Sequence, residues 1–215
     1  MKLFKIMTSK YLIACGGHGR VVLDALTSNG QKIDGIIDAQ LKIGSLIFGV
    51  PIVGDDEFMK TLDPKNTELV NGLGSTGDTT MRQEIYVHWT NLGFKFVGVQ
   101  HSSADIGTEC SIDDSAQVMA GAVLQNRVRV GKNVVINTRA SVDHDVLIAD
   151  HVVISPGAII SGGVKIGHGA FIGAGAVIIQ GLEIGNNCVI GAGAVVRHNV
   201  ANATTVVGNP ATQLE

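Results

Sequence analysis

One histidine of this chain, His144, is flanked on both sides by an aspartate, in the stretch Val142-Asp-His-Asp145. An imidazole can take up a proton near neutral pH, and an adjacent carboxylate can fix its tautomer and support its basicity. A histidine that faces solvent is more often only solvated. Asp143 and Asp145 set His144 apart from the other histidines, and this favours His144 as a general base.

A second stretch, Gly16-Gly17-His18-Gly19, has the composition of a phosphate-binding loop. It follows an expected strand and opens an expected helix, an arrangement in which backbone N–H groups bind phosphate. Asp38 ends the next strand, near the place of a ribose-binding acid in dinucleotide folds, but Val22 stands where that fingerprint has its third glycine. An ordinary turn between strand and helix is the alternative. If the loop binds a nucleotide, a mononucleotide fits this small domain better than NAD.

The three cysteines offer neither a metal site nor a clear nucleophile. Cys15, Cys110 and Cys188 lie far apart, and the last two fall at positions that the repeat described below turns inward. No Gly-x-Ser-x-Gly motif is present, so a covalent acyl intermediate has no candidate residue. A sparse, odd set of cysteines is typical of a reducing compartment. We predict a cytoplasmic protein without a metal.

Composition argues against several classes of protein. The 215 residues carry a formal net charge of −3, whereas a nucleic-acid-binding surface is normally basic. The sequence contains no run of 18 apolar residues, so we expect no membrane span. The basic N-terminal stretch is followed by too short an apolar segment for a signal peptide. A length of 215 residues is enough for two small domains.

From residue 106 onward the chain repeats every six residues without an insertion. Each repeat begins with a branched aliphatic residue: Ile106, Ile112, Val118, Leu124, Val130, Ile136, Val142, Ile148, Ile154, Ile160, Ile166, Ile172, Ile178, Ile184, Ile190 and Val196. A small or apolar residue follows four positions later, and glycine fills many remaining positions. A period of six is the signature of a parallel β-helix, in which three repeats close one triangular coil. Both apolar positions should face inward, whereas His144, His168 and His198 occupy an outward position.

Before the repeat, strands alternate with helices. We expect strands at 11–15, 33–38, 68–72 and 94–99, and helices at 21–28, 56–62 and 80–92. This alternation implies a small parallel sheet of Rossmann character. We therefore predict an α/β domain over residues 1–103 and a β-helix domain with a short C-terminal tail over residues 104–215.

A Gly-Gly-His-Gly loop on a small α/β domain, joined to a hexapeptide-repeat domain, resembles the PglD- and NeuD-type sugar acetyltransferases over nearly the whole chain. The matching stretches are Gly16 to Asp24, Asp38, Val142 to Asp145, Ile154 to Ala158 with Gly162, and Val207 to Ala211. The resemblance implies a left-handed β-helix that binds acetyl-CoA and an N-terminal domain that binds a nucleotide-linked amino sugar. It also implies a homotrimer with active sites between neighbouring prisms.

The resemblance assigns site residues as well. It makes His144 the catalytic base and Asp145 its acidic companion, and it gives Gly162 and Ala192 backbone contacts to acetyl-CoA. The implied nucleotide-binding residues are Gly16, Gly17, His18, Gly19 and Asp38, with Gly74, Ser75 and Arg82 as further candidates. Many relatives have a second histidine where this chain has Val153. His151 occupies a different position in the repeat, so that role is not transferred to it.

The implied reaction is acetyl-CoA-dependent N-acetylation of a UDP-, dTDP- or GDP-linked 4-amino-deoxy sugar, for bacterial surface polysaccharide or glycan synthesis. Without a nucleophilic residue, the amine would attack the thioester directly while a backbone N–H holds the oxyanion.

Three alternatives stay open at the level of sequence. A sugar or sialic acid O-acetyltransferase would use the same histidine. A γ-carbonic-anhydrase-like enzyme would need zinc on three histidines, but no coil register relates His144, His151 and His168. A non-catalytic scaffold would leave the first domain unexplained.

Overall fold

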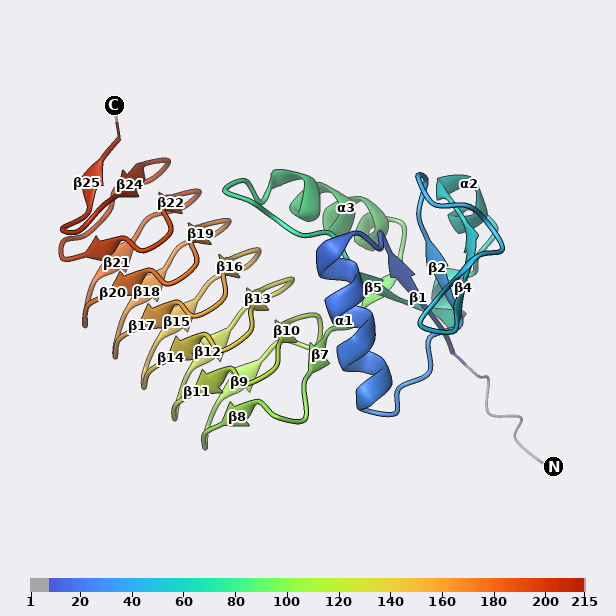
Figure 1. Cartoon of the computed structure of the whole chain (residues 1–215), viewed down its shortest axis with the longest axis horizontal. Helices are drawn as coiled ribbons and strands as arrows, with labels where there is room; N and C mark the ends of the chain where they lie inside the picture. The colour runs from blue at the N-terminus through green and yellow to red at the C-terminus, as the bar shows by residue number, and fades with distance from the viewer. Residues whose placement is uncertain (1–7, 215) are drawn as a thin grey trace. The chain divides into compact units, whose positions relative to one another are not determined.

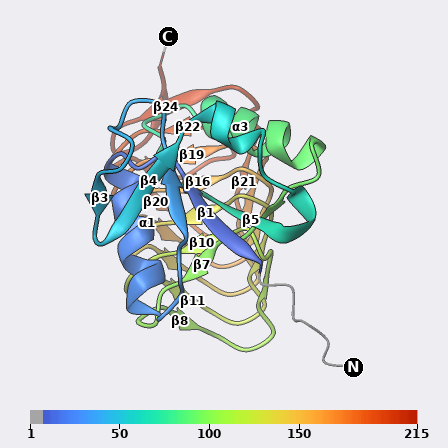
Figure 2. The same cartoon turned by 90° about the vertical axis from the view of Figure 1, so that its right-hand side faces the viewer.

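The computed structural model describes residues 8–214, which divide into two compact units (Figures 1 and 2). The first unit holds the chain up to Gly74 together with Glu84–Val97. The second holds Ser75–Gln83 and the chain from Gly98 onward. The chain thus enters the second unit after Val97, and a short internal segment also belongs to that unit. A single boundary at residue 103 does not describe this division, because the second unit takes in Ser75–Gln83 and begins again at Gly98.

The first unit is built on a six-stranded sheet with the order β3-β4-β2-β1-β5-β6, of which β3, β4, β1 and β5 are labelled in Figure 2. Its strands are β1 (Ser9–Ile13), β2 (Gly35–Ile37), β3 (Leu46–Ile47), β4 (Val50–Gly54), β5 (Thr67–Asn71) and β6 (Lys95–Phe96). All neighbouring pairs are parallel except β3 and β4, which are antiparallel. The predicted Rossmann-like parallel sheet is confirmed.

The helices are α1 (Gly17–Ser28), α2 (Asp56–Met59) and α3 (Thr80–Asn91), with a 3₁₀ turn at Pro64–Asn66. Helix α1 buries Val22, Leu23 and Leu26, the apolar residues that predicted it. It begins four residues before the predicted start at residue 21, because the periodicity shows only where its apolar face begins. The Asp55 carboxylate accepts a hydrogen bond from the Glu57 N–H and caps α2.

Strands β3 and β4 are both absent from the predicted elements, and β3 is the shorter of the two. It pairs with β4 through a turn in which Phe48 has φ 49° and Gly49 has φ 81°. Two residues are too few to show the alternation by which a strand is identified in a sequence.

The second unit is a triangular prism of stacked coils (Figure 1). One face contains β7 (Val99–Gln100), β10 (Gln117–Val118), β13 (Val135–Ile136), β16 (Val153–Ile154), β19 (Phe171–Ile172), β22 (Val189–Ile190), β24 (Thr205–Val207) and β25 (Thr212–Gln213). A second contains β8 (Asp105–Ile106), β11 (Val123–Leu124), β14 (Ser141–Val142), β17 (Ile159–Ile160), β20 (Val177–Ile178) and β23 (Val195–Val196). The third contains β9 (Ser111–Ile112), β12 (Arg129–Val130), β15 (Leu147–Ile148), β18 (Lys165–Ile166) and β21 (Glu183–Ile184). This is the predicted parallel β-helix, and it is left-handed, as in the family that the sequence resembles.

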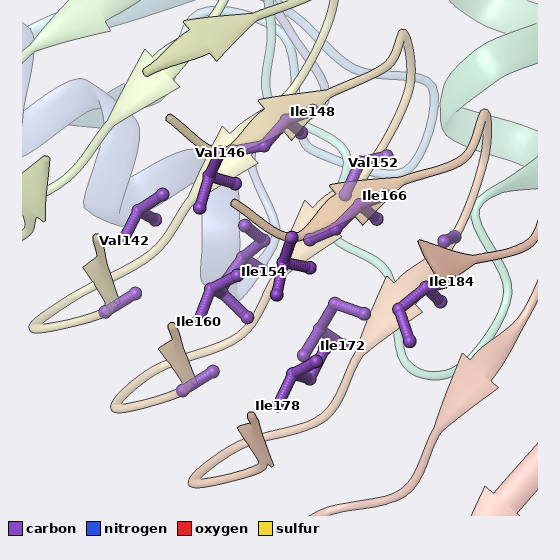
Figure 3. Packing of buried hydrophobic residues seen from close by; sticks show 14 of the residues in the cluster. Val142, Val146, Ile148, Val152, Ile154, Ile160, Ile166, Ile172, Ile178 and Ile184 are labelled. Carbon is purple, nitrogen blue, oxygen red and sulfur yellow. The ribbon is translucent and has the colours of Figure 1, made fainter. Parts of the chain in front are cut away.

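The interior of the prism consists of the repeated aliphatic residues stacked coil on coil, as Figure 3 shows for Ile154, Ile160 and Ile172. These three side chains are fully buried. Burying one such side chain contributes about 1.5–3 kcal/mol. The small residues of the repeat, such as Ala158 and Ala176, are buried too. The stacking fixes the register, so residues 18 apart occupy the same place on successive coils.

The prism begins and ends differently from the prediction. The expected strand at 94–99 is divided: Lys95–Phe96 is β6 of the first unit, whereas Val99 pairs with Gln117 in the prism. Between them, a Cβ on Gly98 would lie 1.7 Å from the Ala116 carbonyl oxygen, so only glycine permits this approach. At the other end β24 pairs in parallel with β22, and β25 adds an antiparallel partner.

Candidate active site

His144 lies on a corner of the prism, directly after β14. Its Nδ1 is 2.8 Å from Oδ2 of Asp145. A carboxylate only accepts hydrogen bonds, so Nδ1 carries the proton and Nε2 presents its lone pair. The imidazole is therefore held in the tautomer that a general base needs.

The two flanking aspartates have different tasks. The Asp143 carboxylate accepts a hydrogen bond from the backbone N–H of His144 at 2.7 Å, so it fixes the main chain. Asp145 contacts the ring itself. The hydrogen bond from His144 is the main cause that lowers the pKa of the Asp145 carboxyl, and the contact with Arg127 adds to it. Asp145 is thus ionised wherever His144 can act as a base.

Gly162 lies one coil beyond His144, against the face of its ring. A Cβ at residue 162 would lie 2.7 Å from both Cε1 and Nε2 of the imidazole. Real Cβ contacts are longer, so any side chain here would displace the ring. Two residues named in the sequence analysis, His144 and Gly162, are therefore brought together.

Arg127 is a residue of this corner that the sequence analysis does not identify. Its Nη2 lies 2.9 Å from Oδ2 of Asp145, and its Nε lies 2.9 Å from Oδ1. The signal that could have found it is the coil register, since Arg127 precedes Asp145 by one full coil.

The corner is open to solvent. The side chains of His144 and Asp145 are 56% and 40% exposed. A groove of about 840 Å³ runs along the third face of the prism, lined by residues such as Arg129, Lys165 and Glu183, but His144 does not line it. An enclosed reaction site at His144 therefore requires a second surface over this corner.

The glycine loop of the first unit has the geometry of an anion-binding site. Gly16 and Gly17 begin α1 without a side-chain cap, and a Cβ on either would meet no atom within 4 Å. A Cβ on Gly19, by contrast, would lie 2.3 Å from the Ala14 carbonyl oxygen. Gly19 is therefore required by the fold, whereas Gly16 and Gly17 leave open space at a helix N-terminus, where phosphate binds favourably.

Two more predicted residues lie beside this loop. Oδ2 of Asp38 accepts a hydrogen bond from the Cys15 N–H at 2.8 Å, and its Oδ1 accepts one from Gln40. A Cβ on Gly74 would lie 3.0 Å from the Cβ of His18. The structure thus gathers the loop, Asp38 and Gly74.

Ser75 and Arg82 belong to the second unit. Arg82 is 1% exposed, and burial lowers the pKa of its guanidinium to about 9. Its backbone carbonyl lies 3.5 Å from Nδ2 of Asn133, on a prism corner. The side chain of Arg82 is thus buried within the second unit, and its predicted contact with the nucleotide stays a prediction.

The prism corner that contains Asn133 also contains His151. Nδ2 of Asn133 lies 2.9 Å from Nδ1 of His151, and the ring centroids of His151 and His168 are 5.0 Å apart. Burial, followed by the charge of His168, lowers the pKa of His151 to about 4. His151 is therefore a neutral, structural histidine near pH 7. Within residues 8–214 no three His, Cys, Asp or Glu side chains are grouped as metal ligands would be.

Ala192 is exposed and follows β22, whereas His144 follows β14 on a different face of the prism. Its predicted contact with acetyl-CoA stays a prediction. Among residues 8–214, no helix combines the length and apolarity that a membrane crossing requires.

Two family models match the chain. The PglD N-terminal domain matches residues 11–88, and the bacterial transferase hexapeptide (six repeats) matches residues 145–180 and 163–198. The first covers the unit with the glycine loop, and the second covers the coils that follow His144.

Solved structures match over nearly the whole chain. A histidine-to-asparagine variant of perosamine N-acetyltransferase from Caulobacter crescentus, in complex with CoA and GDP-perosamine, is 31% identical with a TM-score of 0.89; the match covers 96% of this chain and 97% of that one. The acetyltransferase domain of PglB from Neisseria gonorrhoeae FA1090, in complex with acetyl coenzyme A, is 33% identical with a TM-score of 0.87, covering 97% and 100%. WeeI from Acinetobacter baumannii AYE is 26% identical with a TM-score of 0.87, covering 97% and 100%.

Proposed function

Because this chain belongs to the PglD-type hexapeptide-repeat sugar acetyltransferases, we propose that it transfers the acetyl group of acetyl-CoA to the amine of a nucleotide-linked 4-amino-deoxy sugar. The observation that carries this proposal is the contact between His144 and Asp145. The Asp145 carboxylate binds Nδ1 of the imidazole, and Nε2 is left to accept a proton. The relatives bound to CoA, to acetyl-CoA or to GDP-perosamine support the donor and the class of acceptor.

The proposed reaction is a direct transfer. The sugar amine attacks the thioester carbonyl carbon, a C–N bond forms, and the carbonyl oxygen becomes an oxyanion that a backbone N–H, assigned to Gly162, stabilises. Nε2 of His144 takes the proton from the attacking nitrogen. The C–S bond then breaks, and the imidazolium returns the proton to the CoA sulfur. The products are an N-acetylated sugar nucleotide and free CoA.

The two substrates are assigned to different units. The nucleotide diphosphate binds the open N-terminus of α1 at Gly16 and Gly17, where helix N–H groups and the helix dipole favour an anion. Asp38 and Gly74 border that site. Acetyl-CoA binds the prism, with Gly162 and Ala192 supplying backbone contacts. The widely spaced free cysteines suit a reducing compartment, so we place the reaction in the cytoplasm, in the synthesis of a surface glycan.

The test of this function is a panel of nucleotide sugars offered with acetyl-CoA, with thiol release as the readout. The panel varies the base, the position of the amine, and amine against hydroxyl at the same carbon. We expect thiol release to require an amine. If the hydroxyl sugars are acetylated and the amino sugars are not, the chain is an O-acetyltransferase and the proposal fails.

We predict that the protein is a homotrimer in which a neighbouring prism covers the exposed corner at His144. Analytical ultracentrifugation at micromolar concentration should give the mass of three chains. A monomer that is fully active at that concentration would contradict a site shared between prisms.

We also predict that Gly17→Leu raises the KM for the nucleotide sugar by about 10- to 100-fold. This is the effect expected when a hydrogen bond to a charged phosphate is lost. The new side chain takes up space left for phosphate, and its Cβ would meet no atom of the fold within 4 Å. Isothermal titration with acetyl-CoA should give a nearly unchanged Kd.

The matched control is Ser28→Leu, which places the same leucine side chain at the exposed C-terminal end of α1. It should leave both constants unchanged. Loss of acetyl-CoA binding in Gly17→Leu, with the KM for the sugar intact, would mean that the substrates are assigned to the wrong units.

A further inference from the structure

Arg127 and Asp145 occupy the same corner of two successive coils. Strands β11 and β14, which precede them, pair with Leu124 beside Val142. Both residues have left-handed backbone, with φ 62° at Arg127 and 60° at Asp145. The repeat therefore places the two side chains next to each other.

The contact between them has two points. Nη2 of Arg127 donates to Oδ2 of Asp145 and Nε lies against Oδ1, each at 2.9 Å. A two-point guanidinium–carboxylate contact fixes the plane of the carboxylate, which a single contact does not. Oδ2 also accepts the hydrogen bond from Nδ1 of His144 at 2.8 Å. Arg127, Asp145 and His144 thus form one continuous chain of hydrogen bonds.

This contact is not needed for the fold. The side chains of Arg127 and Asp145 are 55% and 40% exposed, and exposed ion pairs contribute little to stability. An exposed carboxylate without the guanidinium would rotate and be solvated, and the imidazole that depends on it would lose its fixed tautomer.

We propose that Arg127 is a positioning residue of the acetyl-transfer site: it holds the Asp145 carboxylate in the plane that directs the Nδ1 proton and the Nε2 lone pair of His144. This inference rests on the proposed function for its kinetic consequence, but its structural consequence can be measured without turnover.

The kinetic test compares Arg127→Gln, Arg127→Lys and the control Arg139→Gln. Arg139 shares the exposure and the left-handed backbone of Arg127, with φ 55°, but follows β13 on another face of the prism. We expect Arg127→Gln to lower kcat about tenfold, within the range for coupled neighbours, and to leave KM for both substrates nearly unchanged. Arg127→Lys keeps the charge without the two-point contact and should recover only part of kcat. Arg139→Gln should behave as wild type.

A double-mutant cycle locates the effect. In an Asp145→Asn background, Arg127→Gln should lower kcat no further, because the residue through which it acts is already altered. Independent, multiplying losses in the double variant would overturn the proposal.

The structural test is ¹⁵N NMR of the His144 imidazole in the full-length protein, with the signals assigned by their loss in His144→Ala. We expect the Nδ1–H tautomer to predominate in wild type and in Arg139→Gln, and a mixture of tautomers in Arg127→Gln. An unchanged tautomer in Arg127→Gln would contradict the proposal, whether or not the enzyme is active. If the tautomer changes as expected but no nucleotide amino sugar is acetylated by wild type, the function fails and the positioning role stands.

Discussion

His144→Ala should lower kcat by about 10²–10⁴-fold, the usual contribution of general-base catalysis. An amine that attacks a thioester must lose a proton on the way to the amide, and Nε2 of His144 is the acceptor held ready by the contact of Nδ1 with Asp145. The KM for each substrate should change little, because the interaction is used in the transition state. Steady-state kinetics on the wild type and the variant give both constants.

Asp145→Asn should cost less than His144→Ala, because this residue orients the imidazole and does not itself accept the proton. His198→Ala is the matched control, since His198 occupies the same outward position of its repeat and is also exposed. It should retain kcat. A His144→Ala enzyme with near-normal kcat would contradict the assignment of the base.

Gly162→Ala should lower kcat by about 10²-fold, the size of effect that a displacement of roughly 1 Å can cause. The added methyl group would lie 2.7 Å from Cε1 and Nε2 of His144, so the ring must move away from the reacting amine. Kinetics should show this loss in a protein that remains folded by circular dichroism.

Gly181→Ala is the control for this second substitution. Gly181 lies one coil further along, its N–H donates to the Gly162 carbonyl, and a Cβ there would meet no atom within 4 Å. Its φ of 72° makes alanine unfavourable by about 1–2 kcal/mol. Gly181→Ala should therefore lower the free energy of unfolding and leave kcat nearly unchanged. An equal loss of kcat in both variants would mean that the effect of Gly162→Ala is general destabilisation.

The prism could be predicted from sequence because every repeat has the same apolar residues at the same positions. A branched residue at each sixth position, from Ile106 to Val196, fixes the inward face, the register and the period of the coil. The start of the prism was not predicted. Val99 pairs with Gln117 in the first coil, but Gly98 and its neighbours lack the six-residue repeat, so they could not be assigned to the prism.

The site could be predicted in part. The acids flanking His144 are visible in the sequence, but their separate tasks depend on side-chain directions that only the folded corner reveals. The contact of Arg127 with Asp145 joins residues a full coil apart. Arg82 shows the reverse case: a charged residue proposed from the sequence to line the nucleotide site is buried in the second unit.

The most direct test of the account is the chemical identity of the product. Wild-type enzyme, acetyl-CoA and a nucleotide-linked 4-amino-deoxy sugar are incubated, and the sugar nucleotide is examined by mass spectrometry before and after mild alkali. We predict a product that carries one added acetyl group and keeps it in alkali, as an amide does, and that forms far more slowly with His144→Ala. An alkali-labile acetyl group, or no acetylated sugar nucleotide from an enzyme that binds acetyl-CoA, would contradict the account.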